Sequence, residues 1–349
     1  YRTKFAGNDS GALRDVTYEV VDTGVMTVAR RCAVVLGTVL IAGVFLMAPG
    51  VVRAEPAPQW RYTLVGFSSA SARDMDVYES PDGTDFTMIG KSAYRPAVGY
   101  VRDPSIVRHT DGMYYVTYTT ADGATIGIAR SSDRLGWEHV RTVPLPLCCA
   151  FLWGTGDGKG PVAPPLFSGS AGFRDGPSLS PFTTKAWAPE WFVDGDRVHI
   201  IVSLSTGGGF VPYLLTATDS SLRKWGWPVP IAGIGADHID TTVVKVGSLY
   251  HAFTKNETKK LIEHAVAPAL RGPYSFVSPG KWGHLIEGPA VIELPDGKWR
   301  MYLDAYAERK YLYSDSADLT TWSTPKELPG LSGTVRHFSV LREPGIPVG

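Results

Sequence analysis

Cysteine, net charge and long apolar segments are all scarce in this sequence. Its 349 residues include 3 cysteines, and 34 Lys and Arg balance 34 Asp and Glu, so the formal net charge is zero. Because there is no basic excess to attract phosphates, we predict no nucleic-acid partner. Cys32 stands alone and Cys148 adjoins Cys149. This spacing suits no zinc site, and a disulfide between the two neighbours would close almost no loop.

An apolar run from Ala33 to Ala48 is too short to cross a membrane. It has 16 residues, whereas a bilayer span needs roughly 20. The run follows Arg30-Arg31 and precedes Val52-Arg53-Ala54, which is the order of parts in a secretory signal peptide. We expect residues 26–54 to be that signal, cleaved after Ala54, and the mature protein to be secreted without a stable membrane anchor. Residues 1–25 precede a complete signal, and we expect them to be an upstream segment outside the mature protein.

Glycine, proline and aromatic residues are plentiful. The 38 Gly, 26 Pro and 10 Trp are typical of many short strands joined by tight turns rather than of a helical bundle. With 44% hydrophobic and 19% charged residues, the chain can form a large core, and a disordered chain is excluded.

A strand–turn–strand unit recurs about every 50 residues. Each copy has an apolar strand, a tight turn built on Gly with Asp or Ser, and a second strand rich in aromatic residues, which predicts a β-hairpin. The copies are residues 105–118, 191–202, 242–253 and 290–302. A further short strand and a polar turn follow each copy, and these turns lead to Trp137, Trp225, Tyr274 and Trp322.

The two ends of the repeated region complement each other. Strands are predicted at 62–67 and 75–83, and their missing partner is predicted at 334–341. Four full units and one shared between the termini make five four-stranded sheets, and a closed ring of them leaves no sheet edge open. We therefore predict an all-β fold, a five-bladed β-propeller over residues 57–345, interrupted by an insertion at 143–185. An open β-sandwich is the alternative, but it does not account for the period.

Acidic residues stand where the innermost strand of each predicted blade begins: Asp103, Glu190, Asp240 and Glu287. In a propeller these strand openings meet at one mouth of the central channel. Carboxylates gathered there raise one another's pKa, which suits acid–base chemistry. Hydrolysis of a glycosidic bond needs such a set, because one carboxylic acid protonates the leaving oxygen while a carboxylate activates water or attacks the sugar.

Five short motifs follow one another along the chain, and the four acids lie in the first four of them: Arg102-Asp103-Pro104, Trp187-Ala188-Pro189-Glu190, Ile239-Asp240, Glu287-Gly288-Pro289 and Arg336-His337. With them, residues 60–342 resemble glycoside hydrolase family 43, the five-bladed propellers of the furanosidase and xylosidase superfamily. The resemblance implies an inverting enzyme with Asp103 as general base, Glu287 as general acid and Asp240 as modulator of the pKa of the acid. It also implies a carboxyl separation of roughly 6.5–9.5 Å between base and acid. The charge of Asp240 is expected to keep the pKa of Glu287 high.

His337 matches a channel histidine that, in many family members, sits beside a water-coordinated ion. The resemblance therefore implies a structural calcium ion in the channel, held mostly through water because imidazole is a poor ligand for hard calcium. Phe338 replaces the small residue common at that place, and a satisfied core histidine is the alternative for His337. No redox or organic cofactor is required.

The remaining candidates are substrate contacts: Trp187, whose ring face suits a sugar, with Glu190, Asn256, Arg336 and His337, and Lys255 beside them. The expected partner is a polysaccharide or oligosaccharide with α-L-arabinofuranosyl or β-D-xylosyl units, cleaved as by an arabinofuranosidase, a xylosidase or an arabinanase. The protein is expected to be a monomer. A galactofuranosidase or D-arabinofuranosidase acting on a cell-wall glycan stays open as an alternative, as does a non-catalytic glycan-binding propeller.

Overall fold

The computed structural model describes residues 59–120, 124–145, 183–235, 237–279 and 282–345. All described residues belong to one compact unit. The predicted upstream segment, the predicted signal peptide and most of the predicted insertion, with Cys148 and Cys149, lie outside the described residues. Within the described ranges, no helix is long and apolar enough to span a bilayer.

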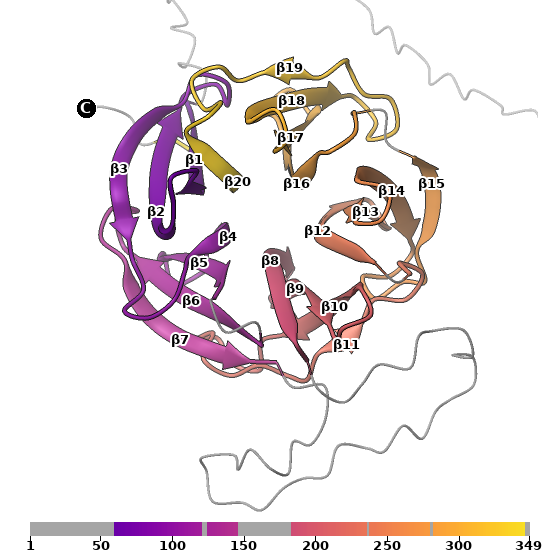
Figure 1. The fold of residues 1–349 in the computed structure, drawn as a ribbon, viewed down its shortest axis with the longest axis horizontal. Coiled ribbons are helices and arrows are strands. Elements are labelled where there is room, and N and C mark those ends of the chain that lie inside the picture. Colours follow the sequence, from indigo (N-terminus) through magenta and orange to yellow (C-terminus); the bar gives the residue numbers. More distant parts are fainter. Residues whose placement is uncertain (1–58, 121–123, 146–182, 236, 280–281, 346–349) are drawn as a thin grey trace, which may run out of the picture. The chain divides into compact units, whose positions relative to one another are not determined.

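Twenty strands of the described residues form five antiparallel sheets of four strands, set in a ring (Figure 1). Blade 1 comprises β4 (Arg102–Arg108), β5 (Tyr114–Thr119), β6 (Thr125–Ser131) and β7 (Glu138–Pro144). Blade 2 comprises β8 (Lys185–Asp194), β9 (Arg197–Ser205), β10 (Phe210–Thr216) and β11 (Val229–Pro230). Blade 3 comprises β12 (His238–Val246), β13 (Leu249–Asn256), β14 (Leu261–Ala267) and β15 (Ser275–Pro279). Blade 4 comprises β16 (Glu287–Glu293), β17 (Trp299–Ala305), β18 (Lys310–Ser316) and β19 (Lys326–Glu327).

The closing blade holds both ends of the propeller. It consists of β1 (Trp60–Ser68), β2 (Ser71–Ser80), β3 (Thr87–Tyr94) and, innermost, β20 (Val335–Pro344). Strand β20 runs antiparallel to β1, from Trp60 opposite Pro344 to Ser68 opposite Val335. The predicted all-β, five-bladed propeller with a shared blade is therefore confirmed, and β4, β8, β12, β16 and β20 surround its centre (Figure 1).

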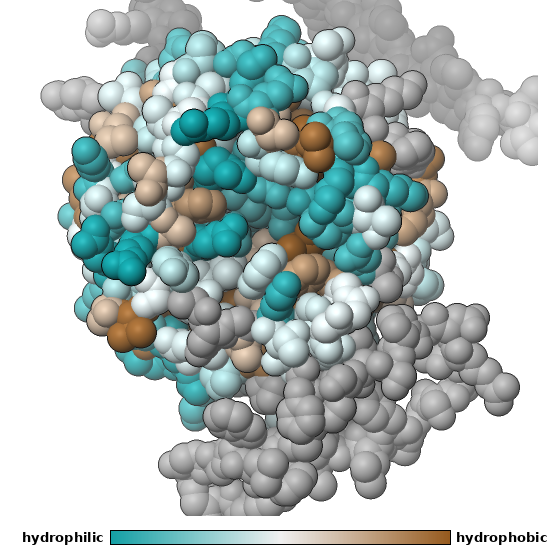
Figure 2. All heavy atoms as spheres, viewed as in Figure 1, coloured by the Kyte–Doolittle hydropathy of each residue, from teal (hydrophilic) through white to brown (hydrophobic). Residues whose placement is uncertain are grey.

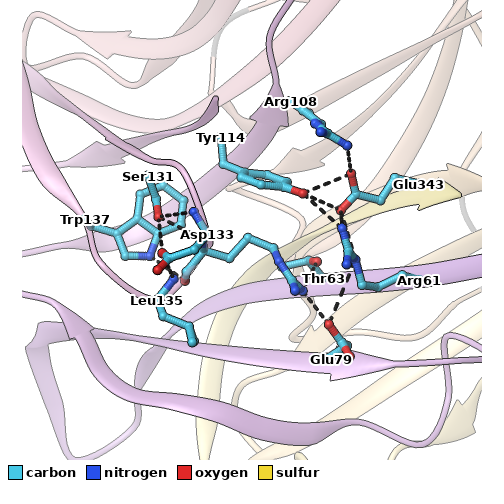
Figure 3. Close-up of polar contacts among 11 residues, drawn as sticks. Arg61, Thr63, Glu79, Arg108, Tyr114, Ser131, Asp133, Leu135, Trp137 and Glu343 are labelled. Atoms are coloured by element: carbon cyan, nitrogen blue, oxygen red, sulfur yellow. Dashed lines mark hydrogen bonds and ion pairs between the residues drawn. The ribbon is translucent and has the colours of Figure 1, made fainter. Parts of the chain in front are cut away.

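A buried carboxylate ties the closing strand to blade 1. Glu343 accepts hydrogen bonds from Arg61 Nη2 at 2.6 Å, from Arg108 Nη1 at 2.9 Å and from the Tyr114 hydroxyl at 2.9 Å (Figure 3). These donors come from β1, β4 and β5, so one side chain joins the last strand to its own sheet and to the next. A buried carboxylate requires such donors, because an unpaired charge in the interior is strongly destabilising.

The predicted polar turns of blades 1 and 4 share one geometry. Asp133 Oδ1 accepts two backbone N–H groups at 2.8 and 2.9 Å, and Trp137 Nε1 donates to the carbonyl of Arg134 at 2.8 Å (Figure 3). Asp318 and Trp322 make the equivalent bonds in blade 4. An Asp side chain readily accepts hydrogen bonds from backbone N–H groups two and three residues later in the chain. A short segment with Asp and, four residues later, Trp therefore follows the third strand in both blades.

The hydrophobic core lies between neighbouring blades. Ile128 of blade 1 packs in one cluster with Ile200 and Leu215 of blade 2, and Tyr62 of the closing blade shares another with Tyr302 of blade 4. Burial of each such side chain contributes about 1.5–3 kcal/mol to stability. On the face drawn in Figure 2, hydrophilic residues predominate and hydrophobic ones form small separate patches. The blade faces thus hold the ring together and leave polar groups at the central strand openings.

Candidate active site

Each central strand carries a β-bulge close to its first residue. In β4 the pairing register shifts between Arg102 and Ser105, and the other four central strands shift at the equivalent place. The second residue of each bulge has a positive φ, between 33° and 57°, and these residues are Asp103, Ala188, Asp240, Gly288 and His337. A positive φ costs energy in any residue but glycine, and strain of this kind collects at functional sites.

The bulges show that the four predicted acids do not share one position of the repeat. Asp103 and Asp240 are second residues of their bulges, whereas Glu287 is a first residue and Glu190 a fourth. All four lie near the strand openings, but at different positions of the bulge. The third bulge residue is Pro104, Pro189 or Pro289 in three strands. Proline cannot donate to a ladder and marks bulges, so aligning the prolines would have shown the offsets.

Asp103, Asp240 and His337 meet at the centre of the ring. His337 Nδ1 lies 3.3 Å from Asp103 Oδ1 and 4.0 Å from Asp240 Oδ2, and all three residues are buried. Thr119 Oγ1 donates to Asp103 Oδ2 at 2.8 Å. Burial would lower the pKa of His337, but the surrounding carboxylates, those of Asp103 and Asp240 first, raise it above its usual value. The imidazolium form of His337 is therefore favoured between two aspartates.

Asp240 is connected to the strand that carries Glu287. The backbone N–H of Gly288 donates to Asp240 Oδ2 at 3.1 Å. Burial raises the pKa of Asp240 to about 6; the charge of Glu287 adds to this rise and His337 opposes it. Asp240 thus holds a proton more readily than an ordinary aspartate, and it fixes the backbone beside Glu287.

Replacement of Gly288 by alanine is expected to damage this arrangement. Gly288 has a φ of +57°, and a Cβ atom on it would lie 3.0 Å from Cγ and Cδ2 of His337. We expect Gly288→Ala to lower the free energy of unfolding by about 1–3 kcal/mol and to lower activity, because the ring of His337 must move. Thermal unfolding and kinetics measure both effects. Gly112→Ala is the matched control, since Gly112 has a φ of +82° but open space at Cβ. Equal losses in both variants would show that backbone strain alone matters.

Glu287 is held between two cations. Lys255 Nζ lies 2.8 Å from Glu287 Oε2, and Arg336 Nη2 lies 2.8 Å from Glu287 Oε1. Burial would raise the pKa of Glu287, but Lys255 first, with His337 and Arg336, outweighs it and lowers the pKa. The expectation that Asp240 keeps the pKa of Glu287 high is therefore wrong for the free protein, because the sequence does not show how far the two cationic side chains reach.

Three residues that support the acids were missed or underrated in the sequence. Thr119, Lys255 and Asp304 each stand directly across the ladder from the first residue of a bulge. Asp304 is fully buried and accepts hydrogen bonds from Arg336 Nε at 2.6 Å and from the backbone N–H of His337 at 3.1 Å. The sequence does hold a signal for these residues. In each of these hairpins, a polar residue near the end of the apolar second strand lies opposite the beginning of the first strand.

Glu190 bonds to the neighbouring blade. Ser105 Oγ donates to Glu190 Oε2 at 2.7 Å, which joins blades 1 and 2. Burial is the main cause of a pKa raised to about 7, which the Ser105 hydrogen bond and His337 oppose. Glu190 therefore carries a proton in a large share of molecules near neutral pH.

The other predicted substrate contacts are divided in space. Trp187 is partly exposed, packs on Phe210 with ring centroids 5.2 Å apart, and has Lys185 Nζ 4.7 Å from its ring centroid. Phe210 is an aromatic neighbour that the sequence did not reveal. Asn256 lies away from the acids, where its amide donates to Glu263 Oε2 at 3.1 Å.

The residues around His337 do not fit a directly bound calcium ion. No group of three or more His, Cys, Asp or Glu in the described ranges is arranged to hold a metal. Phe338 does not reach the channel, because it stacks on Tyr311 in the core at 4.2 Å between centroids.

Comparison with known proteins adds to this geometry. No family model matches the sequence. The α-L-arabinofuranosidase 43 of Humicola insolens is 28% identical over 217 residues, which are 58% of this chain and 38% of that protein. The chain thus matches well under half of the length of this curated relative.

Solved structures share the fold. An exo-β-1,3-galactanase from Clostridium thermocellum superposes with a TM-score of 0.56 and 13% identity, over 84% of this chain and 64% of that chain. A thermostable family-43 glycoside hydrolase gives a TM-score of 0.51 and 18% identity, over 76% of this chain and 88% of that chain. These likenesses show that the chain shares the five-bladed fold of glycoside hydrolases, one of them a family-43 enzyme, and that it is similar in sequence to an α-L-arabinofuranosidase.

Proposed function

We propose that this chain is a secreted, inverting glycoside hydrolase that cleaves furanosyl or xylosyl linkages of a polysaccharide. The observation that carries the proposal is the meeting of acids from three blades, Asp103, Asp240 and Glu287, around His337 and Gly288. A module that only binds glycans gains nothing from burying carboxyl groups against one another, because burial of charge is costly. The name of the curated relative, an α-L-arabinofuranosidase, favours a furanosyl substrate.

The reaction needs two proton transfers. Asp103 accepts a proton from water while the water oxygen bonds to the anomeric carbon, and Glu287 gives its proton to the glycosidic oxygen while the old C–O bond breaks. The products are a sugar with inverted anomeric configuration and an alcohol. Thr119 and His337 orient the carboxylate of Asp103. Asp240 restrains the backbone next to Glu287 through the Gly288 N–H group.

Substrate reaches the acids from the exposed side of the group. The side chain of Glu287 is 18% exposed and that of Arg336 is 28% exposed, whereas those of Asp103 and Asp240 are nearly inaccessible. Arg336 is therefore placed to contact sugar hydroxyls as well as Glu287. Trp187 holds the same bulge position on β8 as Glu287 on β16, and its ring is expected to cover the apolar face of the sugar. No step requires a metal or an organic cofactor.

A panel of p-nitrophenyl furanosides and pyranosides tests the proposal. We expect release of p-nitrophenol from an α-L-arabinofuranoside or a β-D-xyloside. NMR of the first turnover is expected to show the anomer opposite to that of the substrate. Retention of configuration would contradict the assigned roles of Asp103 and Glu287. Absence of hydrolysis across the panel and on arabinan, xylan and galactan would contradict the proposed activity.

A further inference from the structure

A small pocket opens beside the first bulge, apart from the acids. It has a volume of about 330 Å³ and is lined by Arg73, Arg95, Pro96, Ala97, Gly99 and Tyr100. These residues come from the start of β2 and from the connection between β3 and β4. The backbone N–H of Val101 donates to the carbonyl of Ala72 at 2.8 Å, which fixes the two segments to each other.

The pocket lining is cationic, because it contains two arginines and no acidic residue. Arg95 binds both oxygens of Asp74, at 2.6 and 2.9 Å, and this pairing lowers the pKa of Asp74. The exposed guanidinium of Arg73 makes no hydrogen bond or ion pair with any residue in the described ranges. Two guanidinium groups therefore line the pocket, and an anion suits them, because a guanidinium binds a carboxylate with two parallel hydrogen bonds.

Tyr100 adds an aromatic wall to this cationic site. Its side chain is exposed, at 40% of its full accessibility. A ring that is open to solvent at the edge of a pocket offers a flat apolar surface, while the arginines offer charge. A sugar that bears a carboxylate combines the same two features in one unit, an apolar ring face and an anion.

The pocket is close to the proposed base. Tyr100 is three residues before Asp103, and three residues span at most about 10 Å. Arg102, between them, extends over the Phe67 and Trp187 rings, at 5.5 and 6.0 Å from their centroids. The distance suits a substrate chain with one sugar at the acids and another in the pocket.

We propose that this pocket is a subsite for a carboxylate-bearing sugar unit, a uronate, of the polysaccharide that the protein cleaves. The inference rests on the proposed glycoside hydrolase function and names the acidic class of its substrate. Arg73 binds the carboxylate, Arg95 supports it while it stays paired with Asp74, and Tyr100 packs on the sugar ring.

Affinity electrophoresis in gels containing polygalacturonate or glucuronoxylan tests the subsite without turnover, with Glu287→Gln as the parent protein. We expect retardation on at least one acidic polymer, loss of that retardation on its carboxyl-reduced form, and binding about tenfold weaker after Arg73→Gln. Arg197→Gln is the matched control, because Arg197 is also exposed but lies at the turn between β8 and β9, at the end of that hairpin away from the opening of β8. Its binding is expected to equal that of the parent.

Three results would overturn the subsite: equal retardation by the acidic and the reduced polymers, unchanged binding after Arg73→Gln, or equal losses in Arg73→Gln and Arg197→Gln. Hydrolysis of aryl glycosides by the wild type is measured separately. Specific binding without any hydrolysis would count against the proposed function and not against the subsite. Hydrolysis without preference for the acidic polymer would count against the subsite alone.

Discussion

Asp103→Asn is expected to lower kcat/KM by about 10³- to 10⁴-fold on every glycoside that the protein cleaves. Asparagine keeps the shape of the side chain, but it cannot take a proton from the attacking water. The loss should not depend on the leaving group, because attack by water is required for all of them. Steady-state kinetics on aryl glycosides and on an oligosaccharide measure the effect.

Two companion variants separate this role from a general loss of buried charge. Glu190→Gln neutralises another buried carboxyl at the same strand openings, but that group has a pKa of about 7 and is largely protonated at pH 6, so a much smaller loss is expected there. Glu287→Gln is expected to lower kcat/KM by about 10²- to 10⁴-fold on substrates with poor leaving groups. The loss should be far smaller on 2,4-dinitrophenyl glycosides, because 2,4-dinitrophenolate leaves without being protonated. Similar losses in all three variants, regardless of leaving group, would refute the assignment of base and acid.

Lys255→Met is expected to move the alkaline limb of the pH profile of kcat/KM to higher pH by about 1–3 units. Lys255 is the first of the cations that lower the pKa of Glu287. A general acid acts only while protonated, so activity falls as pH rises through its pKa, and kcat/KM reports the pKa of the free enzyme. Removal of the ammonium group raises the pKa of Glu287 and extends its protonated range upward.

The measurement needs a substrate with a poor leaving group, because only such a substrate depends on the acid. Lys245→Met is the matched control: Lys245 also pairs with a carboxylate, that of Asp194 at 2.7 Å, but it is exposed and lies at the far end of β12. Its pH profile is expected to match the wild type. An unmoved alkaline limb in Lys255→Met, with a folded protein by circular dichroism, would show that Lys255 does not set the protonation of Glu287.

The blades could be predicted because each repeats a local pattern. Hairpins predicted at 105–118, 191–202, 242–253 and 290–302 fall on paired strands, and the closing strand predicted at 334–341 lies within β20 except for Thr334. Turn chemistry and alternating burial act over a few residues, so one sequence carries that information. The outermost strands were harder, since β11 and β19 have only two residues each and read as part of a turn.

The site could be predicted by residue and not by geometry. Asp103, Asp240 and His337 do meet, but the register of the bulges and the pairing across each hairpin decide which side chains touch. The lowered pKa of Glu287 depends on two long cationic side chains from β13 and β20, and their reach follows from tertiary packing. The predicted roles and the predicted secretion stay predictions.

Strand β20 follows the other described strands in the chain, and it carries Arg336, His337 and Glu343 together. Until β20 pairs with β1, a nascent chain lacks both the strand that closes the ring of blades and the histidine that lies between the two aspartates. Closure of the ring and onset of the proposed catalysis would then coincide in one event, the docking of β20. A chain cut before Val335 would lack the closing strand and the histidine together, so the proposed hydrolytic activity could serve as a direct assay for closure of the ring.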